Sequence, residues 1–570
     1  MKKTIVLLAC CFSLASFGYA QKDVPKGWHL MDVSQDSLYG ISLNKAYQFL
    51  REKGRKPQQV IVAVLDGGID TTHEDLKDVL WRNPKEIPGN GIDDDGNGYV
   101  DDVHGWNFLG NKNGSDLKKA GDERSRVYYQ FREKYAKDSC DTAHFSPEEK
   151  YQYKTWKRAY DDINASSTDQ VELALIEVTA KALKKHDKII REEMGKDEYT
   201  TDQLEAFDPK TKQGKEAKFG YLTCMKMIGV DADEKNTTTL SELDEYIQGK
   251  KEAIDARSNP VPDYRAAVVK DNYNDIKDKF YGNADVMGPD PMHGTHVAGI
   301  IAAERNNGKG IDGVADDVKI LPVRIVPDGD EYDKDVALGI FYAVDNGAKV
   351  INMSFGKPFS PQKRWVDSAV HYAEMKDVLL VHAAGNESED IDEKENYPNA
   401  QFLNQRTAEN FITVGASSDP RLGKGLAADF SNYGEHNVDV FAPGVKIYST
   451  LPGGNNYGNL RGTSMASPIV AGLAALIRSY FPNLTAEQVK QVIESSVTHP
   501  GMDITTYKPG TKDEVTFSSL SKSGGIINAY GAVKAAFALS NSLQHSSAET
   551  SKKKNEKLPS SSFKNSKTQN

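Results

Sequence analysis

The run VIVAVL occupies residues 60–65 and leads directly into Asp66, Gly67 and Gly68. A run that is β-branched or aliphatic at nearly every position is typical of a strand buried on both faces, and the glycines favour a turn after it. Similar apolar runs follow: KILPVRI at 319–325, KVINMSF at 349–355, VLLVHA at 378–383, FITVGA at 411–416 and VDVF at 438–441. Helical patterns alternate with them at 294–303, 335–346, 365–375 and 464–480. This alternation predicts an α/β fold with a doubly wound, mostly parallel sheet and helices on both faces.

The overall composition excludes several classes of protein. The chain has 570 residues, of which 38% are hydrophobic and 27% are charged. It is too long for one core, because single cores rarely exceed about 250–300 residues, and it is apolar enough to fold. The 82 acidic residues outnumber the 71 lysines and arginines, so the formal net charge is −11. A general nucleic-acid binder carries the opposite excess, and no nucleic-acid partner is expected.

The first 20 residues have the pattern of an export signal. Lys2 and Lys3 precede an apolar run over 5–17, and Gly18-Tyr19-Ala20 supplies small residues around a cleavage point before Gln21. The run is too short to span a membrane comfortably, and no later stretch approaches 18 apolar residues, so no integral membrane span is expected. The pattern predicts a secreted or periplasmic protein. It favours simple export over lipid attachment at Cys10, because a cut there would leave a very short apolar core.

The rest of the chain divides into parts of different character. We expect an N-terminal arm over 21–59, a sheet domain built from 60–112 and 275–540, and a mainly helical insertion over 113–274. Residues 541–570 are rich in Ser, Lys, Asn and Gln and are predicted to form a disordered tail. Cys140 and Cys224 remain in the exported chain, either joined by one disulfide or as two free thiols.

Two helices are indicated within the insertion. The segment SPEE at 146–149 offers an N-cap, a proline at the first helical position and a glutamate two residues later. Asp169 opens a second helix. Val171, Leu175, Val178 and Ala182 there keep the spacing of one helical stripe, which we expect to be buried.

Three residues at strand ends and helix starts supply the parts of a nucleophilic site. Asp66 ends the first strand, His293 opens a helix in MHGTHVAGI, and Ser464 opens a small-residue helix in RGTSMASPIVAG. Serine becomes a useful nucleophile when an imidazole takes its proton, and the imidazole needs a carboxylate to orient it. His293 and His296 stand three residues apart and could also hold a metal, but no third ligand accompanies them.

With these motifs the chain resembles the subtilases, the subtilisin-like serine peptidases. The order Asp66, His293, Ser464 is that of the family, and HGTHVAG at 293–299, NMSFG at 352–356, AAGN at 383–386 and GTSMASP at 462–468 are similar to its motifs. The resemblance covers the sheet domain, which is then the catalytic domain, and neither the insertion nor the tail. Gly67 departs from the pattern, because relatives usually carry Ser or Thr there, so a hydrogen bond near Asp66 would be absent or replaced.

The resemblance implies further roles. Asn386 would donate its side-chain amide to the oxyanion together with the backbone amide of Ser464. Ser354, Phe355 and Gly356 would form an edge that pairs with an extended substrate, and Ala384 and Gly385 would also contact the substrate. The insertion enters the chain beside this site. It would cover the cleft, recognise substrate or bind a partner, or else be passive decoration.

The loop GNGIDDDGNGYVDD at 89–102 is acidic and rich in glycine. Asp93, Asp95 and Asn97 match the start of a calcium-loop pattern, Tyr99 would offer its carbonyl and Asp101 another oxygen. We therefore expect a structural calcium ion here, with a solvated acidic turn as the alternative. No organic cofactor is expected.

The sequence thus predicts an exported serine endopeptidase that hydrolyses polypeptide substrates through an acyl-enzyme. Ser464 would attack the carbonyl, His293 would move the proton, Asp66 would orient His293, and Asn386 would hold the oxyanion. Two alternatives stay open. One is a binding or scaffold protein on an inactive fold, and the other is an exopeptidase whose cleft is capped by the insertion.

Overall fold

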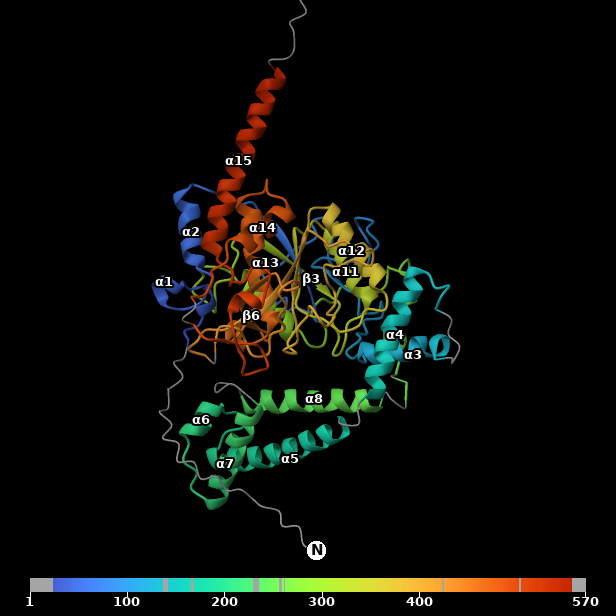
Figure 1. Cartoon of the computed structure of the whole chain (residues 1–570), viewed down its shortest axis with the longest axis vertical. Helices are drawn as coiled ribbons and strands as arrows, with labels where there is room; N and C mark the ends of the chain where they lie inside the picture. Colours follow the sequence, from blue (N-terminus) through green and yellow to red (C-terminus); the bar gives the residue numbers. More distant parts are fainter. Residues whose placement is uncertain are drawn as a thin grey trace, which may run out of the picture.

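The sheet at the centre of the molecule has seven strands (Figure 1). This computed structural model describes residues 24–136, 142–165, 169–228, 235–255, 259–260, 262–422, 425–501 and 504–555. The strands are β1 (Val60–Asp66), β2 (Trp106–Asn107), β3 (Val318–Arg324), β4 (Val350–Met353), β5 (Leu379–Ala383), β6 (Phe411–Ser417) and β7 (Val440–Pro443). Their order is β2-β3-β1-β4-β5-β6-β7 and every pairing is parallel.

Successive residues of β1 point into two different cores. Val62 and Val64 belong to the core on one face of the sheet, whereas Ala63 and Leu65 belong to the core on the other. This is why the run shows no polar alternation in the sequence. The first face is covered by α10 (Met292–Ala302), α13 (Thr463–Tyr480), α14 (Ala486–Ser495) and α15 (Ala529–Asn555), and the second by α11 (Asp333–Asp345) and α12 (Lys363–Met375). The predicted doubly wound α/β class is confirmed.

The strand order fixes where a ligand site is expected. β1 pairs with β3 on one side and with β4 on the other, so the chain proceeds outward in both directions from β1. In open parallel sheets, sites lie beyond the carboxyl ends of the strands where the order reverses. Asp66 is the last residue of β1, and Ser354 follows the end of β4.

The N-terminal arm packs against the first face of the sheet. It contains η1 (Trp28–Leu30), α1 (Val33–Asp36) and α2 (Leu43–Glu52). Trp28 is fully buried, and Leu43, Tyr47 and Leu50 of α2 enter the same core as α13. The arm is therefore part of the structure that supports the sheet.

The predicted start of a disordered tail at residue 541 is wrong, because α15 runs on to Asn555. Leu543 packs against the core, and Asn541 accepts a hydrogen bond of 2.7 Å from Arg55. Once a helix is nucleated by packing, Ser, Ala, Glu and Lys extend it at little cost. Residues 556–570 lie outside the described residues.

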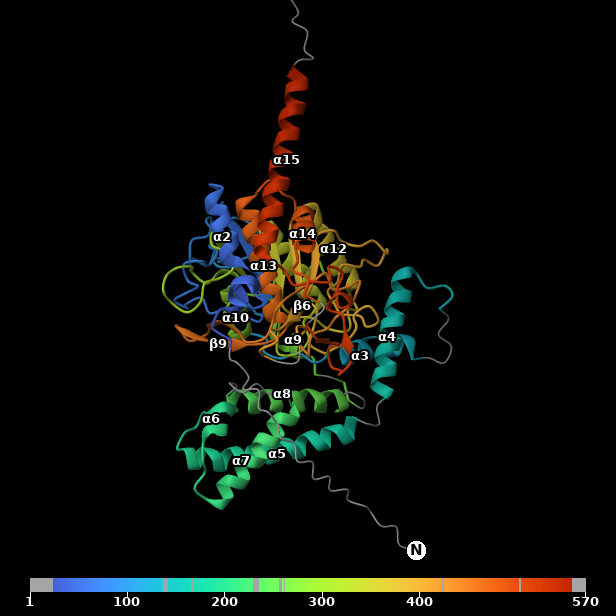
Figure 2. The same ribbon diagram turned by 60° about the vertical axis from the view of Figure 1, so that its left-hand side comes forward.

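The described part of the insertion forms two helical groups (Figures 1 and 2). The first is α3 (Glu123–Tyr135) with α4 (Pro147–Ala165), beside the sheet domain. The second lies below the sheet domain in both views and consists of α5 (Asp169–Met194), α6 (Thr201–Ala206), α7 (Lys212–Ile228) and α8 (Asn236–Asp255). Its core contains Leu183, Ile190, Tyr199, Leu204 and Tyr221, all from this group. The short α9 (Tyr264–Val268) follows.

The expected buried stripe on α5 is wrong. Leu175 and Val178 are each 67% exposed, because the helix turns its other apolar face, with Ala180 and Leu183, towards α7 and α8. The expected N-cap of α4 is present, since Ser146 and Glu149 bond each other's backbone N–H groups.

The remaining regular elements are small. They are the antiparallel pairs β8 (Ile447–Leu451) with β9 (Asn456–Leu460) and β10 (Thr506–Tyr507) with β11 (Glu514–Val515), and η2 (Phe517–Ser519). In the described ranges, no helix combines the length and apolar character needed to cross a membrane. Cys140 lies outside these ranges, and Cys224 is a half-buried thiol on α7.

Candidate active site

Asp66 and His293 meet at the end of β1 and the start of α10, although 227 positions separate them in the chain. His293 Nδ1 lies 2.8 Å from Asp66 Oδ1 and 3.0 Å from Oδ2. Asp66 is nearly buried, and its Oδ1 also accepts the backbone N–H of Gly67 at 2.7 Å. Gly67 has no side chain that could donate to Asp66, and the hydrogen bond from residue 67 comes from its backbone N–H. Both interactions fix the orientation of the carboxylate.

A glycine allows α10 to approach Asp66 this closely. A Cβ on Gly294 would lie 2.2 Å from the carbonyl oxygen of Gly68 and 3.1 Å from Asp66 Oδ1. Any side chain at this position would therefore push the start of α10, and His293 with it, away from β1.

The electrostatic setting of His293 favours its protonated form. Burial of the ring by itself lowers the pKa, but the negative charge of Asp66, the hydrogen bond to Asp66 and the charge of Asp290 raise it more. The net result is a pKa above the ordinary imidazole value. The side chain nevertheless keeps 38% of its surface exposed, so a substrate can reach the ring.

Ser464 lies at the start of α13, the most deeply buried helix of the sheet domain. Every residue of α13 except Ser464 is buried. The helix shares one core with α10, so the sheet and α10 together fix its position. Ser464 Oγ donates to the carbonyl of Ser354 at 3.1 Å. Among the described residues no hydrogen bond joins Ser464 to His293, so the hydroxyl must leave Ser354 before it can donate to the imidazole.

Pro468 explains a second bond between Ser464 and Ser354. Pro468 has no N–H to donate to the carbonyl of Ser464, four residues earlier in the helix. The hydroxyl of Ser354 donates to that carbonyl at 2.9 Å instead. Ser354 in turn accepts from the side chain of Asn352 at 2.9 Å. The end of β4 and the start of α13 are thereby held in register.

Two amide nitrogens face one small space beside Ser464. Asn386 Oδ1 accepts the N–H of Thr463 at 2.8 Å and its hydroxyl at 3.0 Å, which leaves the Asn386 NH₂ group on the other side. An atom in the Cβ position of Gly462 would lie 3.6 Å from Asn386 Nδ2, 3.7 Å from Asn386 Oδ1 and 3.6 Å from the backbone nitrogen of Ser464. Two amide nitrogens this close to one point are suited to stabilise a negatively charged oxygen.

The residues predicted to bind substrate fall into two groups. Phe355, Gly356 and Gly385 line a cavity of about 720 Å³ together with Ser464 and Asn386. Ser354 and Ala384 are buried behind its surface, where Ser354 bonds α13 and the Ala384 carbonyl accepts from Asn396 at 2.8 Å. The same cavity is lined by four residues of the insertion: Asp122, Arg124, Arg158 and Asp162. Sequence reasoning missed these, because no motif links them to the site.

The acidic loop gathers a different set of carboxylates from the predicted one. Carboxylate oxygens of Asp93, Asp95 and Glu86 all lie within 4.8 Å of one another. Asp101 instead accepts the backbone N–H groups of Asn90 and Gly91, and the Asn97 side-chain oxygen accepts the N–H of Tyr99 at 2.8 Å. Asp93 and Asp95 also accept N–H groups, from Asn97 and Gly98, but they belong to the group of carboxylates within 4.8 Å of one another and Asp101 does not.

Glu86 is the residue that the pattern missed, since it precedes the loop. It is only 5% exposed, and its Oε1 accepts the N–H groups of Asp94 and Asp95 at 2.9 and 3.3 Å. Its Oε2 is buried without a hydrogen-bond partner among the described residues. A buried, unpaired carboxylate oxygen beside two further carboxylates is a donor set suited to a hard cation such as Ca²⁺.

His296 does not share a ligand site with His293. It is fully buried, and its Nε2 donates to the carbonyl of Gly458 at 3.1 Å. Burial lowers the pKa of His296 to about 3, so the ring is neutral. His293 meanwhile faces Asp66. A metal site shared by His293 and His296 therefore has no support in this geometry.

Comparison with known proteins agrees with this architecture. The profile of the subtilase family matches residues 57–532, so this chain belongs to the subtilase family. It is 41% identical over 250 residues to a thermophilic serine proteinase of Bacillus sp. (strain AK1), covering 43% of this chain and 53% of that protein. It is 37% identical over 273 residues to thermitase of Thermoactinomyces vulgaris, covering 47% and 85%. It is 37% identical over 224 residues to a cell wall-associated protease of Bacillus subtilis (strain 168), covering 39% and 23%. The chain thus spans about half the length of the first of these relatives.

Replacing Gly294 by alanine is expected to separate Asp66 from His293. The new Cβ meets backbone oxygen at 2.2 Å, so the folded state should lose about 1–3 kcal/mol. Urea unfolding measures this loss. Gly339→Ala on α11 is the control, because its Cβ would meet only side chains, at 3.2 Å or more. Equal midpoints for the two variants would contradict the argument.

Proposed function

We propose that this protein is a serine endopeptidase. The observation that carries the proposal is the pair formed by His293 and Asp66, together with the two amide nitrogens that face one space beside Ser464. In this mechanism Ser464 Oγ attacks the peptide carbonyl while its proton passes to His293 Nε2. Asp66 holds Nδ1 and stabilises the imidazolium.

The remaining steps use the same groups. The carbonyl oxygen becomes negatively charged and accepts hydrogen bonds from Asn386 Nδ2 and the Ser464 N–H. His293 then gives its proton to the leaving amine as the C–N bond breaks. Water enters and attacks the ester carbonyl while His293 takes its proton, and His293 then returns that proton to Ser464 Oγ as the ester C–O bond breaks, which restores both residues. Phe355 and Gly356 border the cavity, and their backbone is suited to pair with an extended peptide.

Labelling with a fluorophosphonate probe tests the proposal directly. The wild-type protein should be labelled, and Ser464→Ala should not be labelled while its melting curve stays unchanged. Asn386→Ala should react about 10²–10³-fold more slowly, because one of two oxyanion donors is lost. Lack of labelling of the wild type would favour a scaffold on an inactive fold. Removal of only terminal residues from long peptides would favour an exopeptidase.

The activity is expected to depend on pH through His293. His293 must be neutral to accept the proton, so kcat/KM should rise with pH through a pKa above the ordinary value of about 6.5. Asp290 is exposed, its charge raises the pKa of His293, and its Oδ1 accepts the N–H of Met292 at 3.3 Å, a bond that asparagine can keep. Asp290→Asn should therefore move this limb to lower pH and leave the plateau unchanged. High salt should reduce the difference between the two profiles. A limb at or below the ordinary value in the wild type would contradict the assignment.

We also propose that the acidic loop binds a structural calcium ion through Glu86, Asp93 and Asp95. The buried, unpartnered Oε2 of Glu86 supports this ligand set. When bound, the ion would offset repulsion among the three carboxylates and hold the loop at 89–102 against Glu86.

Calcium should raise the thermal midpoint of the wild-type protein, and chelator should lower it. A ligand at 100 times its Kd stabilises by about 2.7 kcal/mol. Glu86→Gln should abolish the calcium-dependent shift. Asp101→Asn should keep it, because Asp101 is not in the group of carboxylates that lie within 4.8 Å of one another. A shift that is lost in Asp101→Asn and kept in Glu86→Gln would favour the ligand set expected from the sequence.

Export is the third element of the proposal. It is supported by Lys2 and Lys3, the apolar run over 5–17 and the small residues before Gln21, all of which lie outside the described residues. The relative from Bacillus subtilis is a cell wall-associated protease, which agrees with a working place outside the cytoplasm.

A further inference from the structure

Two helices of the insertion are built into the cleft that holds Ser464. The cavity of about 720 Å³ is bordered on one side by Ser464 and Asn386 and on another by Asp122 and Arg124 at the start of α3 and by Arg158 on α4. The insertion therefore borders the cleft directly. Its side chains also contact the segment that follows β4.

Phe359 joins the cleft segment to the core of α3 and α4. It stands three residues after Gly356 and is 1% exposed. Its neighbours in one hydrophobic cluster are all from the insertion: Val127, Tyr128, Phe131, Tyr135, Trp156, Ala159 and Ile163. The segment over 354–359 thus ends with a side chain that is buried in the hydrophobic core of α3 and α4.

Lys357 provides a second attachment. Its ammonium group lies 2.7 Å from Glu123 of α3 and 2.8 Å from Asp333, and all three side chains are at most 2% exposed. Burial alone would lower the pKa of Lys357, but Asp333, Glu123 and Glu331 hold it above the ordinary value. Removing one partner of such a buried pair leaves an uncompensated charge, so α3 and the cleft segment are tightly coupled.

Arg158 contacts both this segment and the neighbouring segment that follows β5, and the two segments also pair with each other through the backbones of Lys357 and Tyr397. Its guanidinium donates to the carbonyl of Pro358 and to the carboxylate of Glu395, and lies 4.2 Å from the centre of the Phe359 ring. Pro358 follows β4, whereas Glu395 belongs to the segment that follows β5 and carries Asn386. One arginine of the insertion therefore connects both segments that border Ser464. The planar guanidinium can hold two acceptors at fixed angles, which a lysine cannot.

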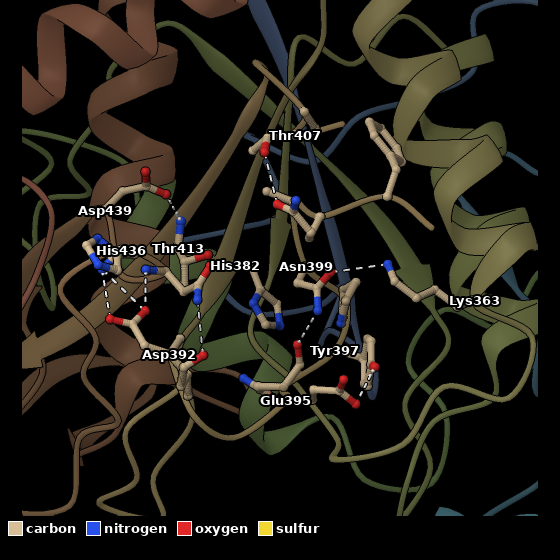
Figure 3. Close-up of a pocket in the computed structure, with 18 of the residues that line it drawn as sticks. Lys363, His382, Asp392, Glu395, Tyr397, Asn399, Thr407, Thr413, His436 and Asp439 are labelled. Carbon is tan, nitrogen blue, oxygen red and sulfur yellow. Dashed lines mark hydrogen bonds between the residues drawn. The ribbon is translucent and has the colours of Figure 1, made fainter. Parts of the chain in front are cut away.

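Other contacts from the same face of α4 support this connection. Tyr151 donates to the carbonyl of Ser360 at 2.9 Å, and Lys154 lies 3.5 Å from Glu395. Figure 3 shows the neighbouring cavity of about 650 Å³, in which Glu395 and Tyr397 lie together, joined by a hydrogen bond of 2.8 Å. Positions 151, 154 and 158 recur at helical spacing, so one face of α4 lies along the edge of the cleft.

We propose that α3 and α4 form the outer wall of the substrate cleft, and that Arg158 is a positioning residue that holds both segments bordering Ser464 against this wall. This inference rests on the proposed serine endopeptidase function. Arg158 therefore affects substrates long enough to contact the segments that follow β4 and β5 along this wall. A small probe that reaches only Ser464 does not depend on it.

The test compares Arg158→Gln with Lys157→Gln in the full-length protein. Lys157 carries the same charge on the same helix, pairs with Asp161 of that helix and does not line the cavity. Substrates are matched fluorogenic peptides that are lengthened one residue at a time on either side of the cleaved bond. The second readout is the rate of fluorophosphonate labelling.

Arg158→Gln should lower kcat/KM for long peptides about 10- to 100-fold, mainly through KM, and leave short peptides and labelling unchanged. Glu395→Gln should also lower kcat/KM for long peptides, and the loss in the double variant should be smaller than the product of the two single losses, because both variants break the contact between Arg158 and Glu395. Arg158→Lys should restore only part of the loss. Lys157→Gln should behave as wild type.

Several results would overturn the proposal. Equal effects of Arg158→Gln and Lys157→Gln would mean that any loss of charge on α4 is enough. A fall in labelling as large as the fall in peptide cleavage would mean that the site itself is disturbed. Unchanged cleavage of long peptides would exclude a positioning role for Arg158 while leaving the proposed function intact. A wild type that neither labels nor cleaves would remove both.

Discussion

The burial of α13 against the parallel sheet is the constraint on which the site depends. A helix that is apolar on all sides can be accommodated only inside the protein, and here the one residue that escapes burial is Ser464. Its neighbours are then fixed by the ends of the strands that α13 crosses. Ser354 bonds it from the end of β4, and Asn386 bonds Thr463 from the segment after β5. Packing that is not specific to any reaction thus determines where the reactive groups lie.

Charged groups also contribute to this arrangement, and they do so differently at His293 and at the ion pairs of the insertion. At the proposed reaction centre the side chain of His293 keeps 38% of its surface exposed, so that its protonation state can change. Between the insertion and the cleft, in contrast, the ion pairs that join Lys357 to Glu123 and Asp333 are buried. Breaking a buried pair leaves an uncompensated charge inside the protein, which suits an attachment. The proposed general base, His293, is therefore partly exposed to solvent, whereas the ion pairs that attach the insertion are buried.

The sequence predicted the parts of the fold in which local pattern and final environment agree. VIVAVL at 60–65 is a strand because both of its faces are covered, and SPEE at 146–149 begins a helix because its bonds are local. Prediction failed where a distant partner decides the outcome. On α5 two apolar faces compete, and the position of α7 and α8 selects the one with Leu183. Glu86 lies outside the acidic motif, and the role of Arg158 appears only once Glu395 has been brought beside it.

The two helical groups of the insertion differ in one respect that bears on the history of the chain. The helices α5 to α8 complete their own core, with Leu183, Tyr199 and Tyr221 at its centre. Phe359 of the sheet domain, in contrast, is shared with α3 and α4. Mutations in the core of the first group change only the packing of that group, so we expect it to be able to diverge, be lost or be exchanged between lineages. The second group must change together with the enzyme body, and its sequence should record that joint ancestry.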